Sequence, residues 1–147
     1  MKQLLILLMS PILIIGQTMH EINAGSYYFT PSSLTIEQGD TVVWINDGGM
    51  HDVNGDINSI TNDSFNNPEV FNSESTSVAG SIIYTHIFNV SGDYNYDCSV
   101  GSHALNGMVG SITVNPVLNC EDIYINSQEY EVFGDSFKIK NAPKEIS

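Results

Sequence analysis

Short runs of β-branched and aromatic residues alternate with turn-forming tripeptides over residues 27–114, and this rhythm limits the fold more than any other feature. The run 41–46 reads Thr-Val-Val-Trp-Ile-Asn, and residues 94–98 place Tyr, Tyr and Cys at every second position. Gln38-Gly39-Asp40 and Ser91-Gly92-Asp93 are typical turn sequences. Helical periodicity and internal repeats are both absent from the sequence. The pattern predicts an all-β protein whose two sheets pack as a sandwich.

Five strands follow from these runs. We expect them at residues 34–36, 41–46, 82–90, 94–98 and 110–114. The stretch 54–79 is polar and rich in Asn and Ser, which predicts a long connection with one short helical or strand-like piece near residues 65–71.

The two ends of the chain differ from this core. Lys2 and the apolar run 4–15 predict a secretory signal peptide over residues 1–17; it is too short to span a bilayer comfortably, and an uncleaved membrane anchor is the alternative. We therefore expect an exported protein, periplasmic, secreted or on the cell surface, without a membrane span once the signal is cleaved. Residues 18–117 form the predicted sandwich domain.

Residues 118–147 are predicted to be a C-terminal extension or linker. This segment contains Cys120 and two short strand-like runs, 122–126 and 129–133. Its last six residues resemble the lead-in to the C-terminal sorting domains of secreted and surface proteins of Bacteroidetes-type bacteria. That resemblance implies a truncated sequence.

The charge is strongly one-sided. The net charge is −13, and the four basic residues are Lys2, Lys138, Lys140 and Lys144. A surface this negative repels phosphate backbones and anionic lipids, which argues against nucleic acid as a partner. It attracts basic proteins and speeds their encounter, although simple solubility is an equal alternative explanation.

Residues 98–108 carry the chemistry. They place Cys98, His103 and Met108 in a C-x4-H-x4-M pattern between two expected strands. Soft sulfur combined with imidazole selects copper over hard cations, and one Cys, two His and a long axial Met form the ligand set of one-electron copper sites. His51 follows an earlier strand and sits in a loop, so it is the natural second histidine.

A disulfide offers the competing explanation for the cysteines. Cys98 and Cys120 would pair in a metal-free sandwich if the protein is exported. That alternative leaves His103 and Met108 without a role, so we favour the copper site.

These residues carry a resemblance to a known family. Phe29-Thr30-Pro31, residues 34–46, His51-Asp52-Val53 and residues 96–114 together resemble the cupredoxins, in particular plastocyanin-like proteins. The resemblance implies a Greek-key β-sandwich and one type 1 copper ion. It also implies transfer of single electrons, with no enzymatic reaction.

The resemblance also implies a role for each ligand. His51 and His103 would bind through imidazole nitrogen, Cys98 as thiolate and Met108 as a weak axial sulfur. The four residues between Cys98 and His103 resemble azurins and phytocyanins, whereas the four between His103 and Met108 match plastocyanins.

Two residues near the ligands also have expected roles. Asp52 occupies a position where relatives often have Asn, and it is expected to accept a hydrogen bond from the backbone or hydroxyl of Ser99. Tyr96 is expected in the core, although sandwich proteins often keep a corner tyrosine at such a position.

Three classes of function compete. An electron carrier would use His103 as its port, inside an apolar patch of Ala104, Leu105, Gly107 and Gly48-Gly49. Its partner would be a cytochrome, oxidase or reductase with a basic face. A multicopper oxidase is disfavoured because the chain has no His-x-His pair. A copper carrier without redox work, or a metal-free structural or adhesive module, is the remaining alternative.

Two further histidines are expected outside the site. His86 lies in a predicted strand and is expected to be packed or on the surface. His20 is expected to be disordered near the mature N-terminus.

Overall fold

The computed structural model describes residues 16–117 and, as backbone, two short strands at residues 130–133 and 136–139. Residues 16–117 contain seven strands and one short 3-10 helix. These elements are β1 (Met19–Gly25), β2 (Tyr28–Thr30), β3 (Ser33–Glu37), β4 (Thr41–Asn46), β5 (Ile82–Ile87), β6 (Gly92–Asp97), η1 (Ala104–Asn106) and β7 (Val109–Asn115). Of the helices in this described part, none has the length and apolar character needed to cross a membrane.

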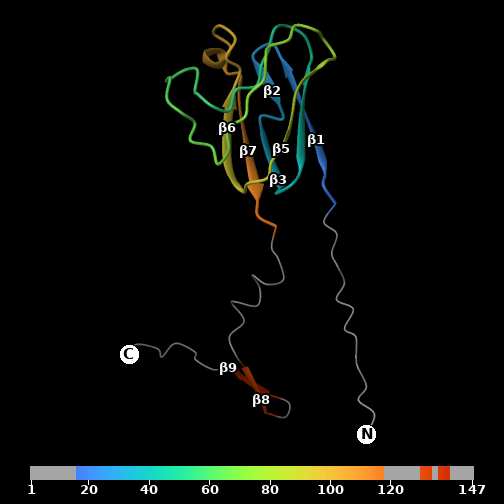
Figure 1. Ribbon diagram of the computed structural model, residues 1–147, viewed down its shortest axis with the longest axis vertical. Coiled ribbons are helices and arrows are strands. Elements are labelled where there is room, and N and C mark those ends of the chain that lie inside the picture. The colour runs from blue at the N-terminus through green and yellow to red at the C-terminus, as the bar shows by residue number, and fades with distance from the viewer. Residues whose placement is uncertain (1–15, 118–129, 134–135, 140–147) are drawn as a thin grey trace. The chain divides into compact units, whose positions relative to one another are not determined.

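The strands form two sheets, shown in Figure 1. One sheet has the order β2-β1-β4-β5, and the other has the order β3-β7-β6. Pairing is antiparallel except between β1 and β4 and between β3 and β7, which run parallel. Trp44 of β4 packs edge to face against Tyr96 of β6, with ring centroids 5.6 Å apart. The predicted all-β, two-sheet sandwich is therefore confirmed.

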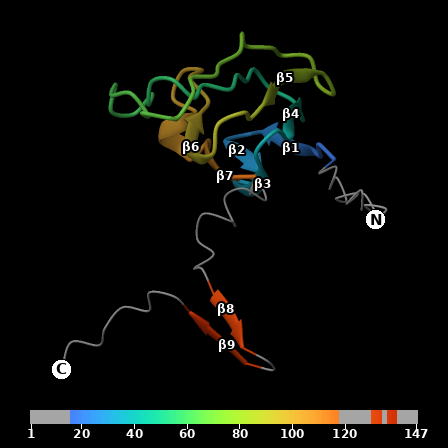
Figure 2. The same cartoon turned by 60° about the horizontal axis from the view of Figure 1, so that its bottom comes forward.

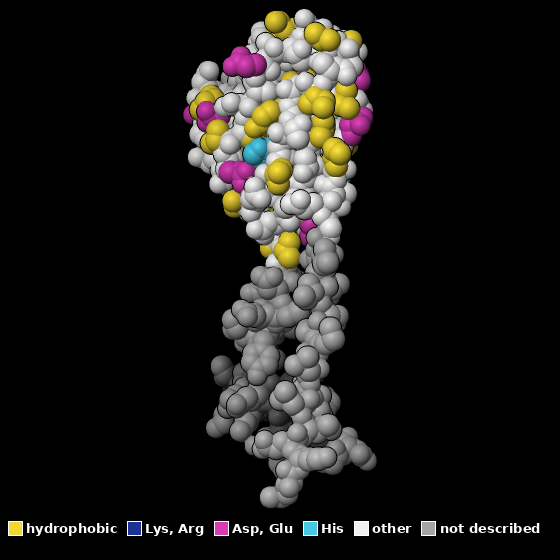
Figure 3. Space-filling model, turned by 45° about the vertical axis from the view of Figure 1, so that its right-hand side comes forward, with side chains coloured by type: hydrophobic (Ala, Val, Ile, Leu, Met, Phe, Trp, Pro, Cys, Tyr) yellow, Lys and Arg dark blue, Asp and Glu magenta, His cyan; other side chains and the backbone are white. Residues whose placement is uncertain are grey.

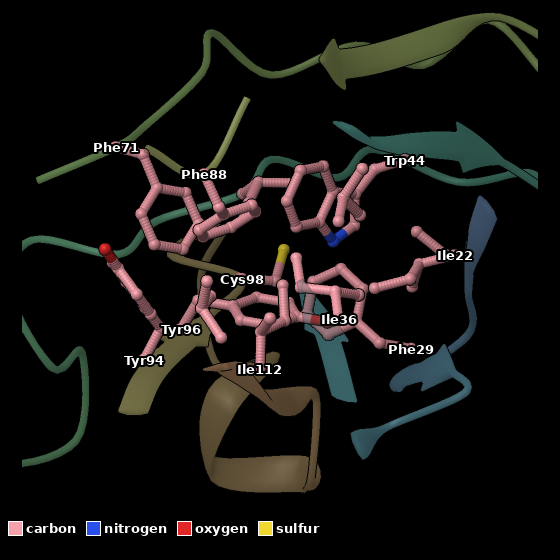
Figure 4. Packing of buried hydrophobic residues seen from close by; sticks show 14 of the residues in the cluster. Ile22, Phe29, Ile36, Trp44, Phe71, Phe88, Tyr94, Tyr96, Cys98 and Ile112 are labelled. Carbon is pink, nitrogen blue, oxygen red and sulfur yellow. The ribbon is translucent and has the colours of Figure 1, made fainter. Parts of the chain in front are cut away.

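Aromatic side chains dominate the core between the sheets (Figure 4). Period-two alternation sends every second residue of a strand inward, which is why Tyr94 and Tyr96 of β6 are buried while Asn95 between them is exposed. The largest fully buried side chains include Trp44, Tyr94, Tyr96, Phe71, Phe88, Ile22 and Ile112. The expectation that Tyr96 belongs to the core is confirmed.

The corner tyrosine is a different residue from the one considered in the sequence. Tyr94 Oη donates a hydrogen bond to the carbonyl oxygen of Val90, four residues upstream, at 2.7 Å. Tyr96 Oη has no hydrogen-bond partner among the described residues. Tyr94 therefore fixes the turn before β6, and Tyr96 contributes packing alone.

Strand β1 was not predicted, and the expectation of disorder at His20 is wrong. β1 pairs in parallel with β4, with His20 opposite Val42. His20 Nε2 lies 2.8 Å from Asp40 Oδ2. Only Ile22, Ala24 and Gly25 of this strand are buried, so the local sequence carries little hydrophobic signal. The pairing with a distant strand is what makes the segment extended.

The long connection between β4 and β5 has no helix or strand in the described structure, so the predicted piece near residues 65–71 is wrong. The connection leaves β4, passes the end of β6 and returns to β5 in the sheet of β4, and Figure 2 shows its course above the strands. Asn54 and Asp97 form an isolated bridge. Asn67 Nδ2 donates to the Asn95 carbonyl and its Oδ1 accepts from the Asn95 backbone N–H, both at 2.8 Å. Amide side chains thus replace the backbone ladder of a regular element.

The chain divides into two compact units after Asn115. In the second unit, β8 (Tyr130–Phe133) pairs in antiparallel fashion with β9 (Ser136–Ile139). β8 lies within the predicted run 129–133, whereas the predicted run 122–126 lies outside the described residues. Residues 1–15 also lie outside them, so the signal peptide stays a prediction, as do the domain boundaries.

Candidate metal centre

Three of the four predicted site residues bring their ligand atoms together, and the backbone of the fourth, Met108, is hydrogen-bonded to two of them. His51 lies in the loop after β4, Cys98 directly follows β6, His103 precedes η1 and Met108 directly precedes β7. One ligand atom each from His51, Cys98 and His103 lie within 4.8 Å of one another. The Cys98 sulfur is 3.9 Å from Nδ1 of His51 and 3.4 Å from Nδ1 of His103.

Met108 is fully buried and is tied by its backbone to two of the other residues. Its carbonyl accepts from the Cys98 N–H at 3.1 Å, and its N–H donates to the His103 carbonyl at 3.0 Å. Gly107 closes the turn in the left-handed conformation, with φ of 100°. The loop from Cys98 to Met108 therefore continues the β6–β7 pairing and is closed by its own hydrogen bonds.

The orientation of His51 is fixed by the loop that carries it. His51 is 2 % exposed, and its Nε2 lies 3.0 Å from the Gly48 carbonyl oxygen. A carbonyl only accepts, so Nε2 carries the proton and Nδ1 is left with its lone pair facing the sulfur. A Cβ on Gly49 would lie 2.8 Å from the same Nε2, which requires glycine there.

Asn46 holds this loop and was missed by the sequence analysis. It is fully buried at the end of β4. Its Nδ2 donates to the carbonyls of Gly49 and Thr76, at 3.0 and 3.1 Å, and its Oδ1 accepts from the Gly48 N–H at 2.8 Å. The sequence did offer a sign of this role: Asn46 is polar, yet it alternates with the inward-facing Val42 and Trp44 along the same strand.

Asp52 links the two ligand-bearing segments, as predicted. One carboxylate oxygen accepts from the Ser99 N–H at 2.7 Å, and the other accepts from the Ser99 hydroxyl. Asp52 follows His51 and Ser99 follows Cys98, so the bond connects positions next to both ligands.

Asp97 is a second carboxylate beside Cys98, and the sequence analysis did not identify it. It is fully buried. It accepts from Asn54 Nδ2 at 2.7 Å and from the N–H and hydroxyl of Ser59 at 2.7 and 2.9 Å. These bonds fasten the start of the long connection to the end of β6.

Protonation in the metal-free protein follows from burial. Burial raises the pKa of Cys98 to about 11, although the backbone N–H groups of Asp52 and Val100 partly oppose the shift. Burial also lowers the pKa of His51, and the nearby His103 ring adds to that effect. The imidazole is therefore neutral and the thiol protonated at neutral pH, so a metal binds by displacing the thiol proton.

The donor set fits copper. Thiolate, two imidazole nitrogens and a thioether are soft or borderline ligands, and no carboxylate belongs to the group of metal-binding side chains found in the described residues. Cys98 is a free, buried thiol among the described residues, and Cys120, its partner in the alternative disulfide, lies outside them. In Figure 4 the sulfur lies in the same cluster as Trp44, Phe88 and Tyr96.

The surface around His103 is apolar, with a composition that differs from the predicted patch. Leu105 is 68 % exposed, as expected, but Ala104 is buried. Two residues that were not predicted are exposed, Tyr27 and Met50. The Tyr27 ring contacts the His103 ring edge to face, with centroids 5.2 Å apart. Tyr27 sits in the β1–β2 turn with φ of 65°, a conformation with no clear sequence signal.

His86 lies outside the site, as predicted. Its Nε2 pairs with Glu69 Oε1 at 2.7 Å, and its ring stacks on Phe71. It is a packed strand residue that anchors the long connection to β5.

The family model for copper binding proteins of the plastocyanin/azurin family matches residues 17–115. The chain belongs to this family. Among relatives, plastocyanin of Scenedesmus fuscus is 34 % identical over 93 residues, covering 63 % of this chain and 91 % of that protein. Chloroplastic plastocyanin of Tetradesmus obliquus is 30 % identical over 97 residues, covering 63 % of this chain and 61 % of that protein.

Solved cupredoxin structures agree with the fold. A purple cupredoxin from Nitrosopumilus maritimus has a TM-score of 0.51 at 28 % identity, covering 65 % of this chain and 99 % of that one. Auracyanin A from Chloroflexus aurantiacus has a TM-score of 0.50 at 19 % identity, covering 68 % and 100 %. With family and site geometry together, this cupredoxin is a type 1 copper protein that transfers electrons and is not an enzyme.

Proposed function

We propose that His51, Cys98, His103 and Met108 are the copper ligands of this electron carrier. The observation that carries the proposal is the convergence of a thiol and two imidazoles within 4.8 Å. Copper bound there supplies a one-electron Cu(I)/Cu(II) couple. Cys98 would hold the ion as thiolate after losing its proton, the two histidines would hold it through Nδ1, and Met108 would offer its thioether sulfur.

The protein contributes rigidity to this reaction. The Gly48 carbonyl holds the His51 ring, and the backbone bonds of Met108 hold the loop before any metal is present. Ligands that barely move between the two oxidation states let the electron leave with little reorganisation.

We further propose that electrons pass through His103 to a partner with a basic face, such as a cytochrome, oxidase or reductase. His103 is the least buried of the four residues, its ring contacts the exposed Tyr27, and the exposed Leu105 lies two residues further on in η1. The described part of the molecule carries Asp and Glu side chains but neither Lys nor Arg on the face in Figure 3. This charge steers a basic partner, and the apolar surface lets it dock briefly.

Export completes the proposal, because residues 1–17 have the composition of a secretory signal. Protein recovered from outside the cytoplasm is expected to begin near Thr18. Mass spectrometry of that material tests the idea, and an intact N-terminus beginning at Met1 would contradict it.

The ligand proposal is tested by adding Cu(II) to the full-length protein. An intense visible thiolate-to-copper band is expected at one equivalent, and oxidised and reduced forms should interconvert by one electron. Cys98→Ser should abolish the band, whereas the matched variant Cys120→Ser should retain it. A Cys98→Ser protein with the intense band, or a wild-type protein without it, would refute the assignment.

A further inference from the structure

Asp52 is a nearly buried carboxylate with only neutral hydrogen-bond partners in the described structure. It is 7 % exposed. Both of its oxygens accept, one from the Ser99 N–H at 2.7 Å and the other from the Ser99 hydroxyl. The two ion pairs found in the described residues involve other carboxylates, Asp40 and Glu69. The negative charge of Asp52 is thus uncompensated by a neighbouring cation.

The described sandwich offers no Lys or Arg to neutralise this charge, since residues 16–117 contain neither. The second buried carboxylate, Asp97, also has neutral donors, from Asn54 and Ser59. Cys98 therefore lies between Asp97, which is a buried carboxylate, and Ser99, which is hydrogen-bonded to the buried carboxylate of Asp52.

We propose that the charge of Asp52 lowers the reduction potential of the copper centre and so makes this carrier a better electron donor. The inference rests on the proposed ligand set. Oxidation removes one electron from Cu(I), passes it to the partner and leaves one additional positive charge at the metal. A fixed negative charge in the poorly screened interior stabilises that oxidised form.

The hydrogen-bond pattern makes Asp52 the carboxylate that can be tested. An Asn at position 52 can still accept from the Ser99 N–H and can donate to the Ser99 hydroxyl, so Asp52→Asn removes the charge and keeps the link. An Asn at position 97 would direct its own N–H groups toward the donors of Asn54 and Ser59. Substitution there would disturb the fold as well as the charge.

The experiment compares reduction potentials of copper-loaded full-length variants, measured by spectroscopic redox titration. Asp52→Asn should raise the Cu(I)/Cu(II) ratio at a fixed applied potential by about tenfold, equivalent to about 59 mV for a one-electron couple. Asp52→Ser supplies a second neutral side chain and should give a rise of the same sign. The matched control Asp63→Asn removes an exposed carboxylate and should leave the ratio unchanged.

Ser99→Ala separates the charge from the hydrogen bond, because it removes the hydroxyl and leaves the carboxylate. It should not raise the ratio. The proposal would be overturned if Ser99→Ala raised the Cu(I)/Cu(II) ratio as much as Asp52→Asn. It would also be overturned if Asp52→Asn raised the ratio no more than Asp63→Asn. Loss of the visible band in both neutral variants would overturn it too, since Asp52 would then act only by holding the ligands. A wild-type protein without the band would instead refute the ligand set.

Discussion

The Nε2 atom of His51 lies 3.0 Å from the carbonyl oxygen of Gly48, and this contact turns Nδ1 of the ring toward the sulfur of Cys98. Gly48 and Gly49 both have positive φ, of 135° and 97°, which lets the loop fold back under the ring. The position of one ligand thus depends on two residues that have no side chain.

Gly49→Ala should weaken copper binding about 10- to 100-fold, because the new Cβ would lie 2.8 Å from Nε2 of His51 and displace the ring. Competition against a Cu(I) chelator of known affinity measures the effect. Gly80→Ala is the matched control, since Gly80 also has positive φ but no atom lies within 4 Å of its added Cβ. Equal loss of affinity in the two variants would show that backbone strain, rather than the ring contact, is responsible.

Leu105→Ser should slow electron transfer to a basic c-type cytochrome about tenfold without changing the visible spectrum. Leu105 is 68 % exposed in η1, two residues after His103, so its loss removes apolar contact area at the port. Stopped-flow kinetics measure the rate constant. Val90→Ser is the control, because Val90 is exposed near the opposite end of β6 from Cys98; a similar loss of rate there would contradict a docking role for the His103 end.

Asp40 should stabilise the fold at neutral pH and lose this effect in acid. Burial alone would raise the pKa of Asp40, but hydrogen bonds from His20 and from the N–H groups of Thr18 and Glu37 outweigh it and lower the pKa. A carboxyl whose pKa is lower in the folded state stabilises above the unfolded pKa of about 4, and this contribution is lost as pH falls through the folded value.

Asp40→Asn should therefore lower the free energy of unfolding of the metal-free protein by about 1–3 kcal/mol at pH 7, and by less near pH 3. Urea unfolding at the two pH values measures the difference. Asp63→Asn, an exposed position, should change little at either pH. A destabilisation by Asp40→Asn that is the same at both pH values would indicate lost packing and contradict the electrostatic explanation.

Two neighbouring tyrosines should respond in opposite ways to loss of the hydroxyl. Tyr94→Phe removes the 2.7 Å bond to the Val90 carbonyl and should cost about 1 kcal/mol of unfolding free energy. Tyr96→Phe removes a buried hydroxyl without a partner in the described structure, so it should be neutral or stabilising by up to about 1 kcal/mol. Urea unfolding of both variants tests the pair, and a greater loss for Tyr96→Phe would contradict it.

The sequence predicted what depends on local pattern. Strand β4 has the predicted bounds, 41–46, because a central strand paired on both sides reads as a continuous apolar run. Cys98, His103 and Met108 stood out as candidate ligands because they lie on one short loop with a characteristic spacing. His51 stood out because it follows that apolar strand, and the structure brings it together with Cys98 and His103.

Features that depend on distant pairing were not predicted. β1 is extended because it pairs with β4, and its own residues are mostly polar. Asn46 acts through three hydrogen bonds whose partners belong to two different loops. Ala104 was expected on the surface, yet η1 turns it inward and leaves Leu105 outside. Each of these outcomes follows from three-dimensional packing that no sequence window contains.

The one-sided charge of residues 16–117 has a kinetic consequence for a population of these molecules. Two identical copies approach each other against their own electrostatic field at low ionic strength, so self-exchange of electrons between them is slow. A cationic acceptor meets no such barrier. If the partner has the basic face proposed above, electron transfer to it is favoured over exchange between identical copies of this cupredoxin.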